Sequence, residues 1–407
     1  MGMGGMARTV GAVVLAFVLG VAGHLSEPLP IREPRTAAER ATLNLVVFDQ
    51  VWTTLDQRHF DSISRREAWR AAMKRYRPLA RRAPDTAGLY HQVLTPMLNE
   101  LGQSHVRATP SRLGRLQWRA QPQGQPARPR IFAYAAKAVN GDVLHDAGIQ
   151  LSGDEVIDLI KGGAAEQAGV EPGWRVSLIM PAAKELRYTF MTPAGAREVM
   201  LSHRRPPPPR MPYGKRVLSS GALLLRFDGF KREQVDWLLT ELKSAPPQGV
   251  ILDLRTNDGG RVVEEERLLG ALLSDHSIIG VRVTNGHRKA LYTRAVADLY
   301  RGPLAVLISP RSSSAAEATA RAIGHHGRGV LVGRRTAGSL LTSTTFKLRD
   351  GGRLQVPIHD FLDPSGQRIE GVGVEPHIHA APTLATVRAG RDPVLEAAEA
   401  ALLSARR

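Results

Sequence analysis

The sequence predicts an α/β protein whose C-terminal half holds a β-sheet buried on both faces. Two observations carry this prediction: short apolar runs recur in that half, and helical patterns separate them. We expect the apolar runs to be strands, at residues 222–227, 249–254, 304–308 and 329–332. The helical patterns lie at residues 235–242, from 264 onwards, and at 315–323. In sheets of this kind, active sites gather at the loops beyond the strand ends.

The N-terminal region is expected to be helical. Between residues 38 and 60 an apolar stripe repeats every fourth residue, the spacing of one helix face, at Leu43, Val47, Val51 and Leu55. Further helical patterns run through Trp69 and again from residue 89 to residue 101. Gly102 is a natural helix stop, so Ser104 and His105 should lie just beyond a helix end.

Proline-rich stretches divide the chain into segments. They occupy residues 26–37, 119–130 and 205–212. The divisions predict a signal peptide or anchor at 1–25, an N-terminal helical region at 38–118, a compact inserted domain at 131–204, and an α/β core at 213–407. Inside the inserted domain, residues 162–170 are expected to join a strand to a short helix.

The composition is that of a globular protein, and it excludes several kinds of catalytic and metal site. The chain of 407 residues has no cysteine, which excludes disulfides, thiolate catalysis and zinc sites built from cysteine. Its close histidine pairs, at 325–326 and 377–379, lack the helical spacing and the carboxylate of a zinc peptidase. The formal charge of +17 is consistent with attraction to anionic partners or simply with a soluble surface. Because only 5% of the residues are aromatic, no surface for binding nucleic acid is expected. No metal or cofactor is predicted.

The first residues have the pattern of an export signal. Arg8 precedes an apolar run from Val10 to Ala22, whose 13 residues match the core of a signal peptide and are short for a transmembrane helix. The small residues at its end do not form a clean Ala-x-Ala cleavage site. A cleaved signal, a retained membrane anchor and a buried helix therefore all stay open. We expect an exported protein of the periplasm or cell envelope.

Ser314 is the first candidate catalytic group. It lies where the strand at 304–308 turns into a helix, so its hydroxyl would project beside backbone N–H groups that can stabilise an oxyanion. The alternative is that Ser312, Ser313 and Ser314 only cap that helix, which serines commonly do.

Three further features could belong to the same chemistry. Gly259 and Gly260 follow a strand and let backbone amides approach a ligand, although they would also suit a plain turn. His105 could serve as a general base near neutral pH. Glu370 lies in a glycine-rich loop, where the alternative is a solvated carboxylate.

These pieces occur together, in this order, in one family: the chain resembles the C-terminal processing peptidases and the related tricorn core proteases. The matching motifs are Leu101–His105, Ala168-Gly169 with Pro172-Gly173, Asp253–Gly260, Ser312–Glu317 and Glu370–Pro376. The resemblance implies a serine peptidase with Ser314 as nucleophile, acting on a peptide or protein substrate. It also implies a ClpP/crotonase-like α/β core with an inserted PDZ-like domain.

One departure from the family decides the expected mechanism. The processing-peptidase branch uses a Ser–Lys dyad, but here Ser339 occupies the position of that lysine. The tricorn-like branch uses a Ser–His–Ser–Glu tetrad, and the resemblance implies that its four roles fall to Ser314, His105, Ser104 and Glu370. By the same resemblance, amides near Gly259 or Gly260, and that of Ala315, would hold the oxyanion.

Two other classes of function stay open at this point. A catalytically inactive relative could bind peptides or lipids, and a scaffold could use the PDZ-like domain to capture a partner's C-terminal carboxylate. Because matching residues fill all four catalytic roles, the enzyme is favoured. The motifs predict neither the cleavage specificity nor the oligomeric state.

Overall fold

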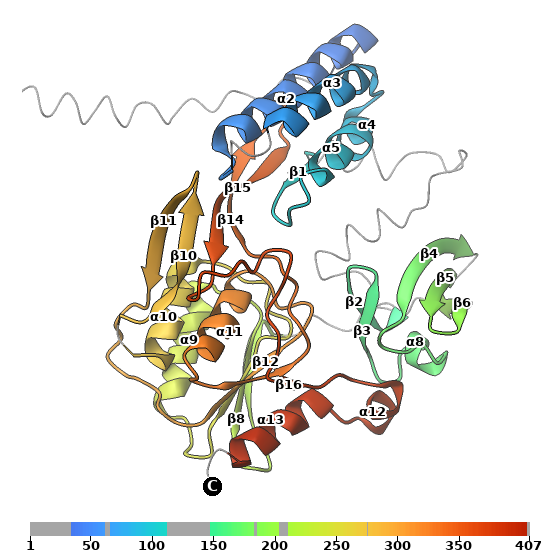
Figure 1. The fold of residues 1–407 in the computed structure, drawn as a ribbon. Coiled ribbons are helices and arrows are strands. Elements are labelled where there is room, and N and C mark those ends of the chain that lie inside the picture. The colour runs from blue at the N-terminus through green and yellow to red at the C-terminus, as the bar shows by residue number, and fades with distance from the viewer. Residues whose placement is uncertain are drawn as a thin grey trace, which may run out of the picture.

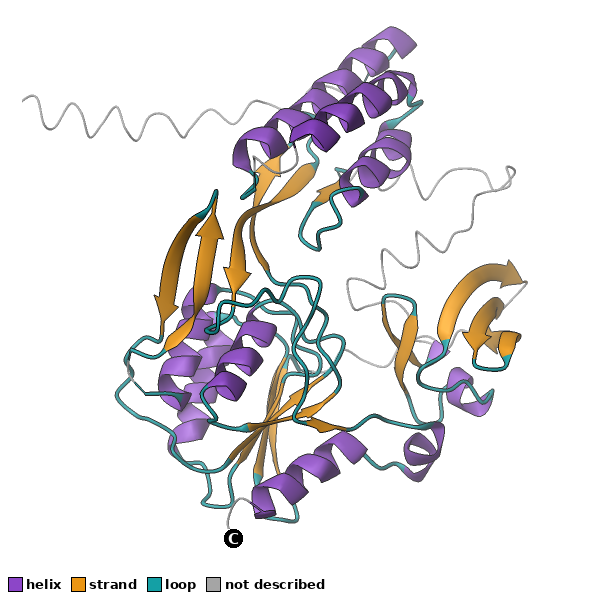
Figure 2. Cartoon of the chain, in the orientation of Figure 1, coloured by secondary structure: helices purple, strands orange, loops and turns teal. Residues whose placement is uncertain are grey.

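The computed structural model describes residues 34–61, 66–111, 147–182, 185–202, 211–274 and 276–404. These residues form a helical N-terminal region and three β-sheets (Figure 1, Figure 2). The predicted export segment at 1–25 and the first part of the inserted domain, 131–146, lie outside them. Within the described ranges no helix has both the length and the apolar character needed to cross a membrane.

The N-terminal region is helical, as predicted. It consists of α2 (Ala37–Arg58), α3 (Arg66–Arg82), α4 (Thr86–Gly88), the π-helix η2 (Leu89–Leu94) and α5 (Thr95–Asn99). α2 begins at a capping box, in which the Thr36 hydroxyl accepts from the Glu39 amide at 3.2 Å. The predicted apolar stripe of α2 is buried in one hydrophobic cluster with residues of α3 and η2.

The core sheet has six strands in the order β16-β13-β12-β9-β8-β7. All neighbouring strands are parallel except the edge pair β7 and β8. The strands are β7 (Tyr213–Val217), β8 (Leu223–Phe227), β9 (Val250–Asp253), β12 (Leu304–Ile308), β13 (Val330–Gly333) and β16 (Ile378–His379). The four strands predicted from apolar runs correspond to β8, β9, β12 and β13.

Helices cover both faces of this sheet, which explains its apolar strands. α9 (Arg232–Lys243), α10 (Val262–Leu272) and α11 (Ala315–His325) pack on one face, and α13 (Pro393–Ser404) packs on the other (Figure 1). Successive residues of β9 divide between the two layers: Val250 and Leu252 join the cluster of the three helices, whereas Ile251 joins that of α13. Strands buried on both faces are apolar throughout.

A second sheet connects the helical region to the core. Its longest strand, β15 (Arg353–Leu362), pairs along one edge with β14 (Leu341–Lys347). Along the other edge it pairs with β1 (Arg107–Thr109) at one end and with β10 (Ile278–Thr284) at the other. β10 continues into the hairpin partner β11 (His287–Tyr292). β15 therefore links residues that follow the N-terminal helices to residues of the core.

A third sheet belongs to the inserted segment. It is antiparallel, with strands β2 (Ile149–Ser152), β3 (Glu155–Leu159), β4 (Arg175–Ala182), β5 (Glu185–Thr192) and β6 (Gly195–Ser202) in that order. The short helix α8 (Ala164–Gln167) follows β3, as the sequence predicted. Val387 of α12 (Leu384–Ala389) belongs to the same hydrophobic cluster as the buried residues of this sheet. The segment also contacts the core through the Ser152 hydroxyl, which donates to the Pro310 carbonyl at 2.8 Å.

Candidate active site

Ser314 lies in the loop between β12 and α11 and has a strained backbone. Its φ of 57° and ψ of −124° belong to a region that residues with a side chain seldom adopt. Two hydrogen bonds from its amide hold this conformation, to the Ser339 carbonyl at 2.9 Å and to Glu317 Oε2 at 3.0 Å. The side chain remains half-exposed at the N-terminus of α11.

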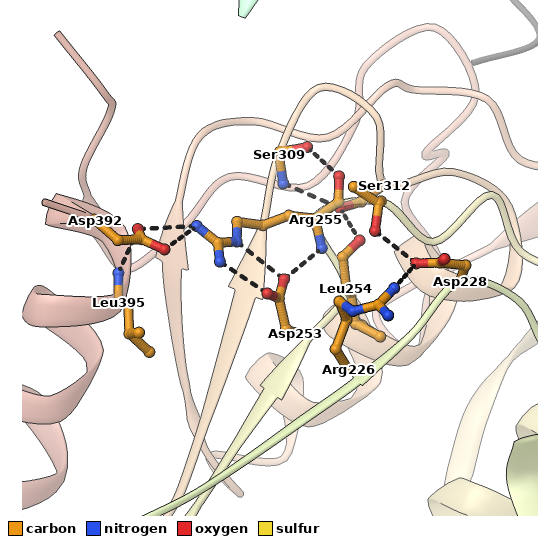
Figure 3. Close-up of polar contacts among 10 residues, drawn as sticks. Arg226, Asp228, Asp253, Leu254, Arg255, Ser309, Ser312, Asp392 and Leu395 are labelled. Carbon is orange, nitrogen blue, oxygen red and sulfur yellow. Dashed lines mark hydrogen bonds and ion pairs between the residues drawn. The ribbon is translucent and has the colours of Figure 1, made fainter. Parts of the chain in front are cut away.

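A neighbouring serine anchors this loop rather than taking part in chemistry. Ser312 is fully buried, and its hydroxyl donates to the Leu254 carbonyl at 2.8 Å while accepting from the Ser309 amide at 3.0 Å. The Ser309 hydroxyl donates to the Arg255 carbonyl at 2.6 Å (Figure 3). The loop after β12 is thus fastened to the loop after β9.

Arg255 fastens the same loop to the C-terminal helix. Its Nε and Nη2 donate to the two Asp253 oxygens at 2.9 and 2.8 Å, and its Nη1 donates to both Asp392 oxygens at 2.9 Å (Figure 3). Asp392 in turn accepts from the Leu395 amide of α13 at 3.1 Å. A guanidinium that bridges two carboxylates holds all three side chains in fixed geometry.

The glycine pair after β9 lies directly against Ser314. A Cβ at Gly259, where φ is +89°, would lie 2.5 Å from the Ser314 Cβ and 2.9 Å from the Ala315 nitrogen. The Gly259 amide is already used, because it donates to Asn257 Oδ1 at 2.9 Å. Among the described residues the amides of Gly260 and Ala315 donate to no other group. Free amides of this kind, beside a hydroxyl nucleophile, can stabilise an oxyanion.

Ser104, His105 and Glu370 form one hydrogen-bonded chain. Glu370 is 6% exposed, and its Oε1 accepts from the Ser104 amide at 2.8 Å. Its Oε2 accepts from the Ser104 hydroxyl at 2.9 Å and from the Leu340 amide at 2.7 Å. The Ser104 oxygen lies 2.6 Å from His105 Nδ1. The structure therefore brings together three of the four predicted tetrad residues, of which Glu370 lies 266 positions from Ser104 in the sequence.

This chain of bonds fixes the tautomer of His105. An ionised carboxylate can only accept, so the single proton of the Ser104 hydroxyl goes to Glu370. The hydroxyl oxygen must then accept from His105, which places the imidazole proton on Nδ1. In the neutral ring, Nε2 is left with a free lone pair.

The surroundings of His105 favour this neutral form. Burial lowers the pKa of His105 below the ordinary histidine value. The carboxylate of Glu370 acts to raise that pKa, and the nearby Arg107 acts with burial to lower it. A neutral imidazole with an unprotonated Nε2 can accept a proton at neutral pH.

A short segment, residues 338–340, connects this hydrogen-bonded chain to the loop that carries Ser314. Its Ser339 carbonyl accepts from the Ser314 amide, and the next amide, that of Leu340, donates to Glu370. In the residues that the structure describes, no hydrogen bond joins the His105 imidazole to Ser314 itself. The two halves of the predicted tetrad are therefore linked through the backbone of residues 338–340.

Glu317 is a buried carboxylate beside the candidate site that the sequence reasoning did not single out. It is fully buried in α11, where Oε1 accepts from Thr336 Oγ1 at 2.5 Å and from the Gly338 amide at 2.7 Å. Oε2 accepts from the amides of Ser314 and Ser339 at 3.0 and 2.8 Å. Burial raises the pKa of this carboxyl, and the hydrogen bonds act in the opposite direction. The Ser-x-x-Glu spacing of a capping box was the signal that could have revealed it.

Comparisons with known proteins identify a family match and relatives of this chain. Residues 222–380 match Peptidase family S41. The chain is 27% identical over 267 residues to the chloroplastic carboxyl-terminal-processing peptidase 3 of Arabidopsis thaliana, a match that covers 55% of this chain and 50% of the relative. It is 23% identical over 383 residues to the chloroplastic C-terminal processing peptidase of Tetradesmus obliquus, which covers 85% of this chain and 79% of the relative. The chain thus spans half the length of the first relative.

Solved structures show the same fold. The photosystem II D1 C-terminal processing protease superposes with a TM-score of 0.55 at 19% identity, over 83% of this chain and 93% of that one. The tricorn protease superposes with a TM-score of 0.54 at 17% identity, over 90% of this chain and 37% of that one. At these identities the likeness concerns the fold, and it confirms the predicted mixed α/β protease architecture.

The region matched by the family includes the loop of Ser314, the glycine pair and Glu370. The matches confirm the family and the enzyme class that the sequence motifs predicted. Residues 222–380 of the chain thus match Peptidase family S41, and the comparisons indicate a serine-type peptidase.

Proposed function

We propose that the chain is an exported serine endopeptidase that hydrolyses peptide bonds through Ser314, His105, Ser104 and Glu370. The observation that carries this proposal is the hydrogen-bonded chain from Glu370 through Ser104 to His105, which leaves Nε2 of a neutral imidazole free. The names of the relatives indicate carboxyl-terminal processing of proteins as the form of hydrolysis to test.

In the proposed reaction, Ser314 Oγ attacks the peptide carbonyl carbon while His105 Nε2 accepts the hydroxyl proton. The carbonyl oxygen becomes an oxyanion, stabilised by the amides of Gly260 and Ala315. His105 then delivers the proton to the leaving amine, and an ester to Ser314 remains. Water, deprotonated by the same imidazole, hydrolyses the ester and regenerates the serine. Ser104 and Glu370 orient the imidazole and stabilise its charged form.

A lysine base is disfavoured by the surroundings of Ser339. This residue stands where the other family branch carries its lysine, and its amide and carbonyl are bonded to Glu317 and Ser314. The first lysine downstream, Lys347, lies at the far end of β14. The six steps from Leu341 to Lys347 along this strand span about 20 Å at about 3.3 Å per residue, too far for proton transfer. Histidine is therefore the base in our proposal.

The finer features of the predicted fold belong to the same proposal. We assign the segment at 131–204 as a PDZ-like domain inserted before a ClpP/crotonase-like core. Its described part contacts the loop that carries Ser314 and the loop after β13, since Ser152 bonds to Pro310 and Glu155 pairs with Arg334. Export follows from the apolar run at 10–22, which a cleaved signal or a retained anchor would explain.

Labelling by a fluorophosphonate, followed by digestion of a mixed peptide library, tests the proposal directly. We expect the wild-type chain to be labelled once, at Ser314, and to release peptide fragments, whereas Ser314→Ala does neither. Labelling at another residue, or a folded wild-type chain with neither labelling nor cleavage, would contradict the proposal. The second outcome would instead favour an inactive relative that binds peptides or lipids.

Gly259→Ala should disable the enzyme without unfolding it. The added Cβ meets the Ser314 Cβ at 2.5 Å, so the nucleophile must move, and a displacement of about 1 Å costs about a hundredfold in rate. We expect kcat/KM on a fluorogenic peptide to fall by about that factor or more.

The matched control for Gly259→Ala is Gly366→Ala. Gly366 has a similar φ of +84°, but its added Cβ would have no atom within 4 Å. Both variants therefore carry the backbone strain of a positive φ, about 1 kcal/mol, and only Gly259→Ala carries the clash. Equal activities in the two variants would show that contact with Ser314 does not matter.

A further inference from the structure

His59 is held rigidly at the junction between the helical region and the core. It is the C-cap of α2, is 7% exposed, and stacks on Phe60 with ring centroids 4.6 Å apart. The backbone of Phe60 is bonded on both sides: its amide donates to the Pro357 carbonyl of β15 at 3.0 Å, and its carbonyl accepts from the Asn285 amide at 2.8 Å. The imidazole of His59 therefore has one well-defined position.

The hydrogen bonds of His59 also define its tautomer. Nδ1 accepts from the Asp61 amide at 3.1 Å, so it carries no proton. In the neutral ring the proton is on Nε2, which donates to Gln103 Oε1 at 2.7 Å. Burial of the group and the fixed direction of its N–H make this a specific bond to one oxygen of Gln103.

Gln103 depends on this bond. Its side-chain nitrogen is buried and has no hydrogen-bond partner among the described residues, so the bond to His59 orients the carboxamide. Gln103 directly precedes Ser104 and His105 in the turn between α5 and β1. Gly102, before it, has a φ of +60°, and its amide donates to the Asn99 carbonyl at 3.0 Å. The side chain of Gln103 fastens this turn to the end of α2.

We propose that His59 and Gln103 are positioning residues, which set the orientation of the Ser104–His105 turn toward the nucleophile. This inference rests on the proposed function, because it assigns to His59 a role in placing the general base. His59 acts through Gln103, and its side-chain hydrogen bonds among the described residues go to Gln103 and Asp61, not to Ser314. Small errors in the placement of a reacting group reduce the rate of the chemical step more than substrate binding.

The test compares two replacements of His59. His59→Phe keeps a planar ring to stack on Phe60 but has no donor, whereas His59→Gln can offer an amide N–H near the place of Nε2. On a fluorogenic peptide, we expect His59→Phe to lower kcat by roughly 10- to 100-fold with KM within about twofold. We expect His59→Gln to recover most of that loss, which a purely structural role of the ring would not produce.

A double-mutant cycle shows whether His59 acts through Gln103. Gln103→Met keeps the length of the side chain and removes its oxygen, so it should lower kcat to a similar extent. If the two residues act as one unit, His59→Phe combined with Gln103→Met loses no more than the larger single effect. Because Gln103→Met leaves the packing of His59 on Phe60 intact, it also serves where His59→Phe lowers the yield of folded protein.

His326→Phe is the matched control. His326 also caps a helix, α11, and also has Nε2 bonded to one oxygen, the Ile278 carbonyl at 2.7 Å. We expect it to keep wild-type kcat. Folded His59→Phe with wild-type kcat, or losses that simply multiply in the double variant, would overturn the inference. His105→Ala, measured alongside, distinguishes failure of this inference from failure of the proposed function. An active His105→Ala enzyme would refute His105 as the general base.

Discussion

Ser314→Ala is expected to lower kcat by about five to six orders of magnitude while the protein stays folded. Loss of the nucleophile leaves only the oxyanion donors and substrate binding, which give a residual rate well below that of the intact enzyme. Thermal unfolding of Ser314→Ala should resemble the wild type, because alanine at this position keeps the same strained φ of 57°. The measurement is kcat on a fluorogenic peptide together with a melting curve.

Ser314→Gly separates chemistry from strain at the same position. Glycine adopts a positive φ without the cost that a side chain imposes, about 1 kcal/mol or more. We therefore expect Ser314→Gly to be as inactive as Ser314→Ala but to melt at a higher temperature. A lower melting temperature for the glycine variant would show that the strain at φ 57° is not relieved by removing the Cβ.

The neighbouring serines provide further controls. Ser313 is half-exposed and is bonded through its amide, to the Asn257 carbonyl at 3.1 Å, so Ser313→Ala should keep nearly full activity. Ser312→Ala removes a buried hydroxyl with two partners and should lose about 1–3 kcal/mol of stability and part of its activity. Wild-type turnover in Ser314→Ala, or inactivation by Ser313→Ala, would move the nucleophile elsewhere.

His105→Ala is expected to lower kcat/KM by about four orders of magnitude, because it removes the proposed acceptor of the Ser314 proton. The base must be neutral, so activity falls as pH decreases through the pKa of His105. Burial holds that pKa below its ordinary value, which is about 6.5, and the acid limb of kcat/KM should therefore lie below about pH 6.5. A pH–rate profile on one peptide measures both effects.

Two neighbours of His105 should move this acid limb in opposite directions. The Glu370 carboxylate raises the pKa of His105, so Glu370→Gln should move the limb to lower pH while also lowering the rate. Arg107 lowers the pKa, so Arg107→Gln should move the limb to higher pH. Lys347→Gln should leave both rate and limb unchanged. His105 would be refuted as the base if each variant shifted the limb the other way, or if the Lys347 variant were as inactive as Ser314→Ala.

The core of the fold could be predicted from local patterns. Continuous apolar runs located β8, β9, β12 and β13 because each strand is buried on both faces. The helix stop at Gly102 placed Ser104 and His105 correctly, in the turn after α5. In these cases neighbouring residues alone determine the local structure.

The second sheet was missed for a physical reason. Its strands mix polar and apolar residues and are only partly buried, so they lack the continuous apolar run that marked the core strands. β15 also contains Pro357, a residue that argues against a strand. One signal was available: Asn285 and Gly286 both have positive φ and join β10 to β11, as an Asn-Gly hairpin turn does.

The contacts of the candidate site lay beyond sequence reasoning for a different reason. Spacing cannot show that Ser104 and Glu370 meet, since the pairing of β1 with β15 brings them into the same region. Only the resemblance to a family suggested the pair. The hydrogen bonds of Glu317 could not be predicted from spacing either, because its partners at 336–339 lie on another loop.

The distance in sequence between Ser104 and Glu370 has a consequence for biosynthesis. Their hydrogen bonds join residues 266 positions apart, and a ribosome that adds about 5–20 residues per second takes roughly 13–53 s to make that interval. In the proposed mechanism, Ser314 is synthesised before Glu370, and its base, His105, cannot be oriented until Glu370 has emerged. Translation would therefore delay hydrolysis until residue 370 has been made. By the same proposal, a truncated product that ends before residue 370 would carry a nucleophile without an oriented base.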